Sequence, residues 1–92
     1  MNYNIRQTTL DAYELVQQDI SKRQKEVYNK LKELGEATNA MLSFELSLPI
    51  NCITPRVHEL RAYGCVIASH VGKCPITHHN AFWWKVNRGR HL

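Results

Sequence analysis

The sequence predicts a single small domain that is mainly α-helical and ends in an antiparallel β-ribbon. Apolar residues recur at helical spacing up to Leu60, and helix-capping residues separate the periodic segments. After Gly64 the pattern changes to apolar, β-branched and aromatic residues, which favour strands. A length of 92 residues allows one domain with a modest core, so we treat residues 1–92 as one unit.

The first predicted helix covers residues 8–20. Thr8 and Asp11 have the spacing of a capping box, and apolar residues follow at intervals of three to four, namely Leu10, Tyr13, Val16 and Ile20. Residues 1–20 carry a net charge of −2, which makes this the acidic part of the chain. We therefore expect the helix to face away from any nucleic acid, and it either covers the core or forms a dimer contact.

The second predicted helix covers residues 21–35. Ser21 and Gln24 form a capping box at its start, and Gly35 closes it. Lysine, arginine and glutamate are interleaved on its other faces, a pattern typical of a solvated surface. The stripe that should be buried consists of Val27, Leu31 and Leu34.

The central stretch predicts a helix-turn-helix with helices at residues 38–47 and 51–63. Thr38 is a good N-cap for the first helix, and a Leu-Pro-Ile interruption ends its pattern. Asn51 is expected to cap the second helix, and Gly64 to end it. In a helix-turn-helix, the second helix lies in the DNA major groove.

The second of these helices can be divided by face. Ile53, Val57 and Leu60 form one apolar stripe, which should pack on the core. Small or hydrogen-bonding side chains dominate the opposite face, which suits a close approach to base edges. This face carries Asn51, Cys52, Pro55, His58, Glu59 and Ala62, with Thr54, Arg56 and Arg61 on the flanks. The alternative is an ordinary helical hairpin whose arginines are merely solvated.

Positive charge is concentrated in the second half of the chain. The net charge of the whole chain is +4, but residues 51–92 hold six lysines and arginines against Glu59 alone. Such an asymmetry is expected of a surface that faces phosphates, although an inert basic surface is also common.

Residues 65–86 predict a β-wing, and residues 87–92 a basic tail. The strands are expected at 65–71 and 81–86, with a projecting nine-residue loop from Gly72 to Asn80 between them. Side chains alternate across a strand, so one of Trp83 and Trp84 should enter the core. The other is either exposed or covered by the first helix or a dimer partner.

These elements, in this order, resemble the winged helix-turn-helix family. The motifs are similar to those of small winged-helix proteins of bacteriophages and prophages: Ser-x-Arg-Gln at 21–24, Gly-x-Ala-Thr-Asn at 35–39, Ile-Thr-Pro-Arg-Val-x-Glu-Leu at 53–60, and glycine before a hydrophobic strand at 64–67. The resemblance covers residues 20–86 and implies a DNA-binding transcriptional regulator in a bacterial host cell. It departs after Thr77, where similar sequences often carry Gly-Arg.

We predict sequence-specific binding to double-stranded DNA, with a homodimer on a two-fold site as a plausible assembly. Base contacts are expected from Asn51, Thr54 and His58, whereas Arg56 would bond a guanine or a phosphate. The helix start at Thr38 and Asn39 would hold a phosphate, and Lys73 or the histidines would serve the wing. The predicted DNA-binding residues are Thr38, Asn39, Asn51, Thr54, Pro55, Arg56, His58, Arg61, Lys73, His78 and His79.

A zinc site is the less favoured alternative. Cys65, Cys74, His70, His78 and His79 supply suitable ligand types, but the chain has no close Cys-x-x-Cys pair. We therefore predict no metal and no cofactor. The odd count of three cysteines also argues against a disulfide framework.

A protein-interaction adaptor, or a DNA-architectural factor, is the alternative function, motivated by the tryptophan pair as an interface anchor. An enzyme is not expected, because the sequence holds no Gly-rich phosphate loop and no carboxylate pair in an acid/base setting. No apolar run approaches the roughly 20 residues that cross a bilayer, and the N-terminus lacks the apolar stretch of a signal peptide. We expect a cytoplasmic protein.

Overall fold

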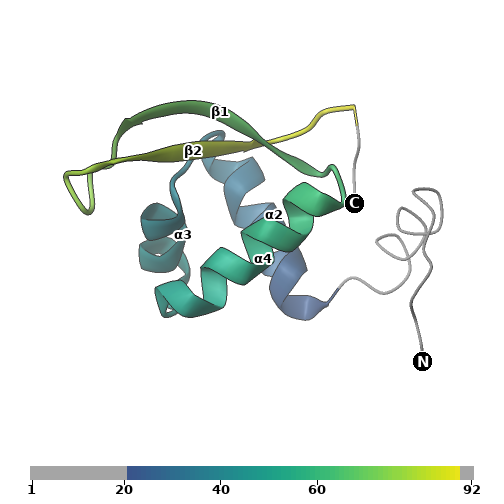
Figure 1. The fold of residues 1–92 in the computed structure, drawn as a ribbon. Coiled ribbons are helices and arrows are strands. Elements are labelled where there is room, and N and C mark those ends of the chain that lie inside the picture. The colour runs from purple at the N-terminus through teal and green to yellow at the C-terminus, as the bar shows by residue number, and fades with distance from the viewer. Residues whose placement is uncertain (1–20, 90–92) are drawn as a thin grey trace.

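The computed structural model describes residues 21–89, which form three helices and a two-stranded antiparallel hairpin that lies across them (Figure 1). The elements are α2 (Lys22–Leu34), α3 (Asn39–Leu46), α4 (Ile50–Ala62), β1 (Val66–Lys73) and β2 (Asn80–Val86). The helix predicted at residues 8–20 and the last residues of the basic tail, 90–92, lie outside the described residues. Within 21–89, no helix is long and apolar enough to cross a membrane.

Local capping fixes the ends of α2. The Ser21 hydroxyl accepts the backbone N–H of Gln24 at 3.0 Å, and the Gln24 side chain accepts the backbone N–H of Ser21 at 3.1 Å. At the other end, Gly35 has a φ of 87° and donates its N–H to the Leu31 carbonyl at 2.9 Å. The capping box and the closing glycine are therefore both present where the sequence indicated them.

The helix-turn-helix is closed by a cap at the start of α3 and by a glycine after α4. The Thr38 hydroxyl accepts the backbone N–H of Met41 at 3.2 Å. After α4, Gly64 adopts a φ of 83°. The N–H groups of Gly64 and Cys65 reach the carbonyls of Arg61 and Leu60, each at 2.9 Å, which is the Schellman pattern.

The predicted cap of α4 is wrong. Pro49 occupies the N-cap position, no side chain caps the helix, and Asn51 is already its second residue. Pro49 has φ −59° and ψ 149°, so the chain enters the helix directly after it, and the N-cap lies two residues earlier than predicted. Asn51 therefore lies in the first turn with its side chain exposed.

The core lies between the three helices and the inner face of the hairpin. The predicted stripe of α4 is buried: Ile53 and Leu60 are 0% exposed and Val57 is 2% exposed. On α2, Tyr28 is buried while Leu34 is only partly buried, so the buried face is rotated slightly from the predicted stripe. The buried cluster comprises Val27, Tyr28, Leu31, Ala37, Leu42, Ile53, Val57, Leu60, Cys65, Val66 and Trp84.

The hairpin is longer, and its loop shorter, than predicted. β1 continues to Lys73 and pairs there with Asn80, so only residues 74–79 form the loop and the predicted nine-residue loop is wrong. A register shift between Ala68 and His70 marks a bulge in β1. Near the packed end, Ala37 adds a bridge to β2, with its N–H and carbonyl bonded to Trp84 at 3.0 and 2.8 Å.

The two tryptophans face opposite sides of β2, as the strand alternation predicted. Trp84 is 6% exposed and belongs to the core. Trp83 is half-buried, because the imidazole of His70 stacks on it with ring centroids 5.2 Å apart. The outer indole is therefore partly covered by its cross-strand neighbour.

Candidate nucleic-acid interface

The solvent side of α4 is the best candidate for a nucleic-acid interface in the described part of the chain. The apolar stripe holds the helix on the core, so the residues on the other side remain open to solvent. Three of the exposed groups can both donate and accept hydrogen bonds: the Asn51 amide, the Thr54 hydroxyl and the His58 imidazole. The exposed residues of α4 are Ile50, Asn51, Thr54, Pro55, His58, Arg61 and Ala62.

The start of α3 lies beside this surface. Asn39 is half-buried, and its amide nitrogen donates to the Thr54 hydroxyl at 3.4 Å, which connects α3 to the exposed side of α4. The Asn39 side-chain oxygen is buried and has no hydrogen-bond partner in the described structure. Thr38 is only 1% exposed. The Thr38 hydroxyl already bonds the Met41 N–H and contacts Cys74. A phosphate at this position would therefore meet the N-terminus of α3 and not the Thr38 side chain.

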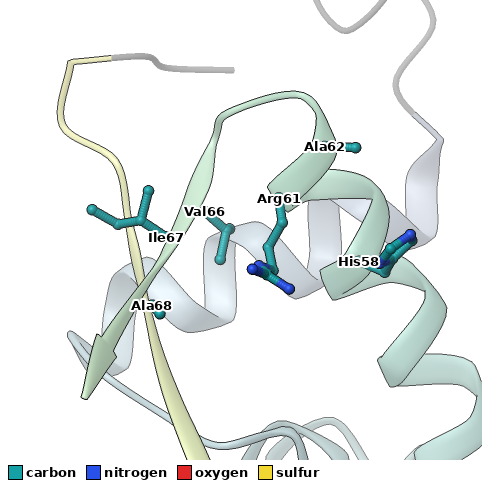
Figure 2. A pocket seen from close by; sticks show the side chains of 6 residues that line it. All are labelled: His58, Arg61, Ala62, Val66, Ile67 and Ala68. Atoms are coloured by element: carbon teal, nitrogen blue, oxygen red, sulfur yellow. The ribbon is translucent and has the colours of Figure 1, made fainter. Parts of the chain in front are cut away.

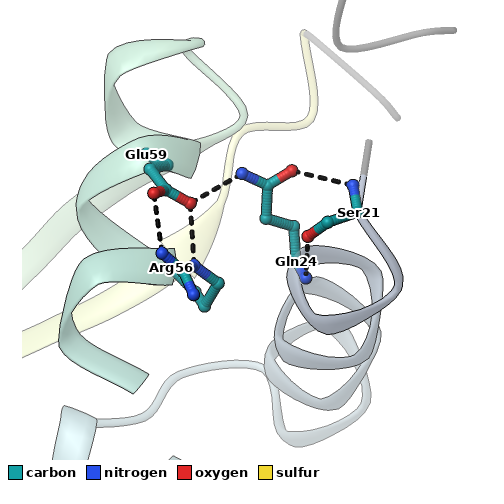
Figure 3. Close-up of polar contacts among 4 residues, drawn as sticks. All are labelled: Ser21, Gln24, Arg56 and Glu59. Atoms are coloured by element: carbon teal, nitrogen blue, oxygen red, sulfur yellow. Dashed lines mark hydrogen bonds and ion pairs between the residues drawn. The ribbon is translucent and has the colours of Figure 1, made fainter. Parts of the chain in front are cut away.

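Arg56 and Glu59 are paired on α4. The Arg56 Nε–H donates to Glu59 Oε1 and the Nη2–H to Oε2, both at 2.8 Å, and Gln24 of α2 donates to Oε1 at 2.6 Å (Figure 3). Hydrogen bonds from Arg56, and secondly from Gln24, hold the pKa of Glu59 below its usual range, against the opposing effect of partial burial. Sequence reasoning placed Arg56 and Glu59 on the same helix but did not pair them.

The same network begins at the cap of α2, because Gln24 is also the residue that completes the box with Ser21 (Figure 3). The amide oxygen of Gln24 bonds Ser21 while its nitrogen bonds Glu59. The Gln24 side chain therefore caps the start of α2 and also binds the Glu59 carboxylate on α4. No sequence signal pointed to this, since Gln24 and Glu59 are 35 residues apart.

Arg61 lies between α4 and the hairpin. Its guanidinium carbon is 4.7 Å from the centroid of a Trp84 ring, a distance suited to a cation–π contact. Figure 2 shows this side chain pointing into a groove of about 390 Å³ between α4 and the start of β1. The groove is lined by His58, Arg61, Ala62, Val66, Ile67 and Ala68. Arg61 is exposed, so its charge remains accessible to solvent above the indole.

The remaining predicted contacts lie at the outer end of the hairpin: Lys73 is the last residue of β1, and His78 and His79 belong to the loop, all three of them exposed. His78 has a φ of 64°, and its N–H bonds the Cys74 carbonyl at 2.8 Å. The Cys74 N–H bonds the His79 carbonyl at 2.9 Å, so the loop is closed by backbone hydrogen bonds. The side chains of the three predicted residues lie around this closed turn.

Cys74 fastens the loop to α3. Its Sγ lies 3.0 Å from the Thr38 hydroxyl and is 0% exposed. Burial raises the pKa of the Cys74 thiol, but hydrogen bonds from Thr38 and from the backbone of Thr77 and Ile76 outweigh it and lower the pKa to about 7. Sequence reasoning treated Cys74 as a possible metal ligand and missed this anchoring contact.

The arrangement does not favour the zinc alternative. Across residues 21–89, no three histidine, cysteine or acidic side chains are grouped closely enough to hold a metal ion. The thiols of Cys65 and Cys74 are both buried, whereas His78 and His79 are exposed at the loop. Cys74 instead takes part in the contact with Thr38.

The sequence matches no protein-family model and no curated protein. A solved structure of a multiple antibiotic resistance repressor, MarR, is similar to this chain. The match covers 83% of the chain described here, with a TM-score of 0.63 and 21% sequence identity. The fold is a winged helix-turn-helix. In this fold α3 and α4 form the helix-turn-helix, and β1 and β2 form the wing. The chain spans about half of that MarR chain, 52% of its length.

Proposed function

We propose that this winged-helix domain binds double-stranded DNA sequence-specifically, as a transcriptional regulator of the phage or prophage type, with α4 in the major groove. One observation carries the proposal: the apolar stripe of α4 is buried while its polar side is exposed beside the start of α3 and the wing. A major groove about 12 Å wide admits an α-helix, so exposed polar side chains on that helix would reach base edges.

The chemistry of the exposed face suits base recognition. The Asn51 amide can pair bidentately with adenine, and Thr54 and His58 can each donate or accept one hydrogen bond. Pro55 lies between Thr54 and His58 in the sequence and presents a small apolar ring on the same exposed face. These three polar residues are the proposed base contacts, with Pro55 as a close backbone neighbour.

The surrounding charge favours phosphates. After Glu59 the sequence contains no aspartate or glutamate, and the exposed Lys73 and Arg88 add positive charge at the two ends of the hairpin. Arg61 presents its guanidinium on the edge of α4, above Trp84. We assign phosphate contacts to Arg61, Lys73 and the α3 start at Asn39, with His78 and His79 at the wing.

Arg56 was predicted to contact a guanine or a phosphate, but its side chain is paired with Glu59. Its guanidinium satisfies both oxygens of Glu59, the one carboxylate of α4, which is half-buried, and Gln24 binds the same group. The pair thereby neutralises a negative charge that would repel phosphates. A direct contact from Arg56 to guanine would require it to leave Glu59, so we favour the positioning role.

A test begins with selection of bound duplexes from random-sequence DNA, followed by fluorescence titration of the best duplex at low and high salt. We expect Asn51→Ala to lower the affinity for the selected duplex by about 1–3 kcal/mol and to relax preference at one base pair. Asn29→Ala, at an exposed asparagine of α2, is the matched control and should bind as the wild type does. Folded protein that selects no duplex at low salt would contradict the proposal.

A second candidate function is protein binding, favoured by two exposed apolar residues near the turn between α3 and α4. Phe44 is 68% exposed and Ile50 is 47% exposed. Exposed apolar groups of this size often contact partners, and the face would also serve a homodimer. Pulldown with the full chain before and after nuclease treatment separates the cases, because a partner held through DNA is lost after treatment.

A further inference from the structure

Two neighbouring apolar residues are exposed at the tip of the wing. The turn at residues 75–77 begins with exposed Pro75, followed by Ile76, which is 43% exposed. Neither side chain belongs to the buried core.

This tip is held firmly. Two backbone hydrogen bonds close the loop, from His78 to the Cys74 carbonyl at 2.8 Å and from Cys74 to the His79 carbonyl at 2.9 Å. The His79 N–H bonds the Thr77 hydroxyl at 3.3 Å. Cys74 is buried against Thr38 at the start of α3, so the loop is tied to the helix-turn-helix. Ile76 is therefore presented on a constrained support.

The surroundings of the tip suit a polyanion. Lys73 precedes it and His78 and His79 follow it, all exposed, and the chain has no acidic residue after Glu59. Because Cys74 ties the base of the tip to Thr38 at the start of α3, the tip lies beside the helix-turn-helix. With α4 in the major groove, the adjacent surface of the duplex is the neighbouring minor groove.

We infer that Pro75 and Ile76 form an apolar wedge that inserts between two base pairs in the minor groove and kinks the duplex. Short apolar side chains from a constrained support unstack base steps, and the bends produced lie between about 20° and 90°. The inference rests on the proposed function, since it assigns a task to the wing of the same DNA-bound domain. It predicts indirect selection for flexible steps such as TA, which are easily unstacked.

The experiment uses the full chain and a duplex selected from random-sequence DNA. 2-Aminopurine is placed at successive steps flanking the α4 site, and dyes at the two ends report bending by energy transfer. Binding of the wild type should raise 2-aminopurine fluorescence at one step and shorten the end-to-end distance. Ile76→Ala should still bind but leave both signals as in the free duplex, and Ile76→Leu should restore them.

Val71→Ala is the matched control, because Val71 is an aliphatic residue of the same hairpin, 59% exposed and away from the tip. It should leave both signals unchanged from the wild type. Binding of the wild type without unstacking, or unstacking that persists in Ile76→Ala, overturns the wedge while leaving the proposed function intact. Failure to bind any duplex at low salt overturns both.

Discussion

Arg56 and Glu59 form a bidentate ion pair on α4, with both nitrogen–oxygen distances at 2.8 Å. The pair lies one turn apart on a single helix, and Gln24 of α2 donates a third hydrogen bond to the same carboxylate. The Arg56 side chain, which was predicted to contact DNA, thus forms an ion pair within the domain. This relationship changes what substitutions on α4 should do.

A double-mutant cycle measures the Arg56–Glu59 interaction. Arg56→Ala and Glu59→Ala should each lower the free energy of unfolding, and the coupling energy should be below about 1 kcal/mol because the pair remains partly exposed. Urea denaturation of the four proteins gives the value. Strictly additive effects of the two substitutions would show that the observed pair contributes nothing to stability.

Acid should weaken the fold through Glu59. Its pKa is lower in the folded protein than the ordinary 4.5, so the stabilisation is present above that value and is lost as the pH falls through the folded pKa. The Glu59→Gln variant removes this titration. Urea midpoints of the wild type and of Glu59→Gln should therefore converge as the pH decreases below about 4.5. A constant difference between the two would contradict the assignment.

Cys74 should make the stability of the wild type depend on pH in a higher range. Its pKa is about 7 in the folded protein against an ordinary 9.0, so the unfolded chain binds more protons between these values and folding becomes more favourable as the pH rises. The gain is complete above 9.0 and is lost as the pH falls through about 7. Cys74→Ala, which retains the other two cysteines, should lack this slope in denaturation measured under reducing conditions.

Two isoleucines of α4 provide a matched test of its orientation. Ile53 is 0% exposed, whereas Ile50 is 47% exposed. Ile53→Ala should lower the free energy of unfolding by about 2–5 kcal/mol, because it leaves a cavity in the core. Ile50→Ala should change it by no more than about 0.5 kcal/mol. Equal losses in thermal or urea unfolding would mean that the helix is rotated from the orientation described above.

Lys73 should contribute to DNA affinity through its charge. Lys73→Ala is expected to weaken binding to all duplexes alike and to reduce the slope of log affinity against log salt by about 1. Lys25→Ala, at an exposed lysine of α2, should leave the slope unchanged. If Lys25→Ala instead lowers the slope, the start of α2 contacts the phosphates.

The sequence predicted the helices well where local signals agree. The capping box at Ser21, the cap at Thr38 and the glycine at Gly64 are interactions between near neighbours in the chain, and all are present. The same reasoning misplaced the cap of α4 at Asn51, because Pro49 begins the helix without a side-chain cap. The predicted strands were also too short at the loop end, because backbone pairing continues to the polar residues Lys73 and Asn80.

The tertiary structure decided which partners the candidate DNA-binding residues and their neighbours have within the domain. Local spacing does not reveal that Gln24 meets Glu59, that Arg61 lies over Trp84, or that Cys74 meets Thr38. Each of these contacts joins different elements, so it exists only once the helices and the hairpin have packed together.

The sequence by itself determined which side of α4 is buried, because the spacing of Ile53, Val57 and Leu60 follows from helix geometry alone. It also determined that the second half of the chain is basic. Only the packed fold decided which charges remain available on that surface, since Arg56 is taken up by Glu59 whereas Lys73 stays exposed. The physical reason is that a charge is neutralised by whichever partner the fold brings within hydrogen-bond distance.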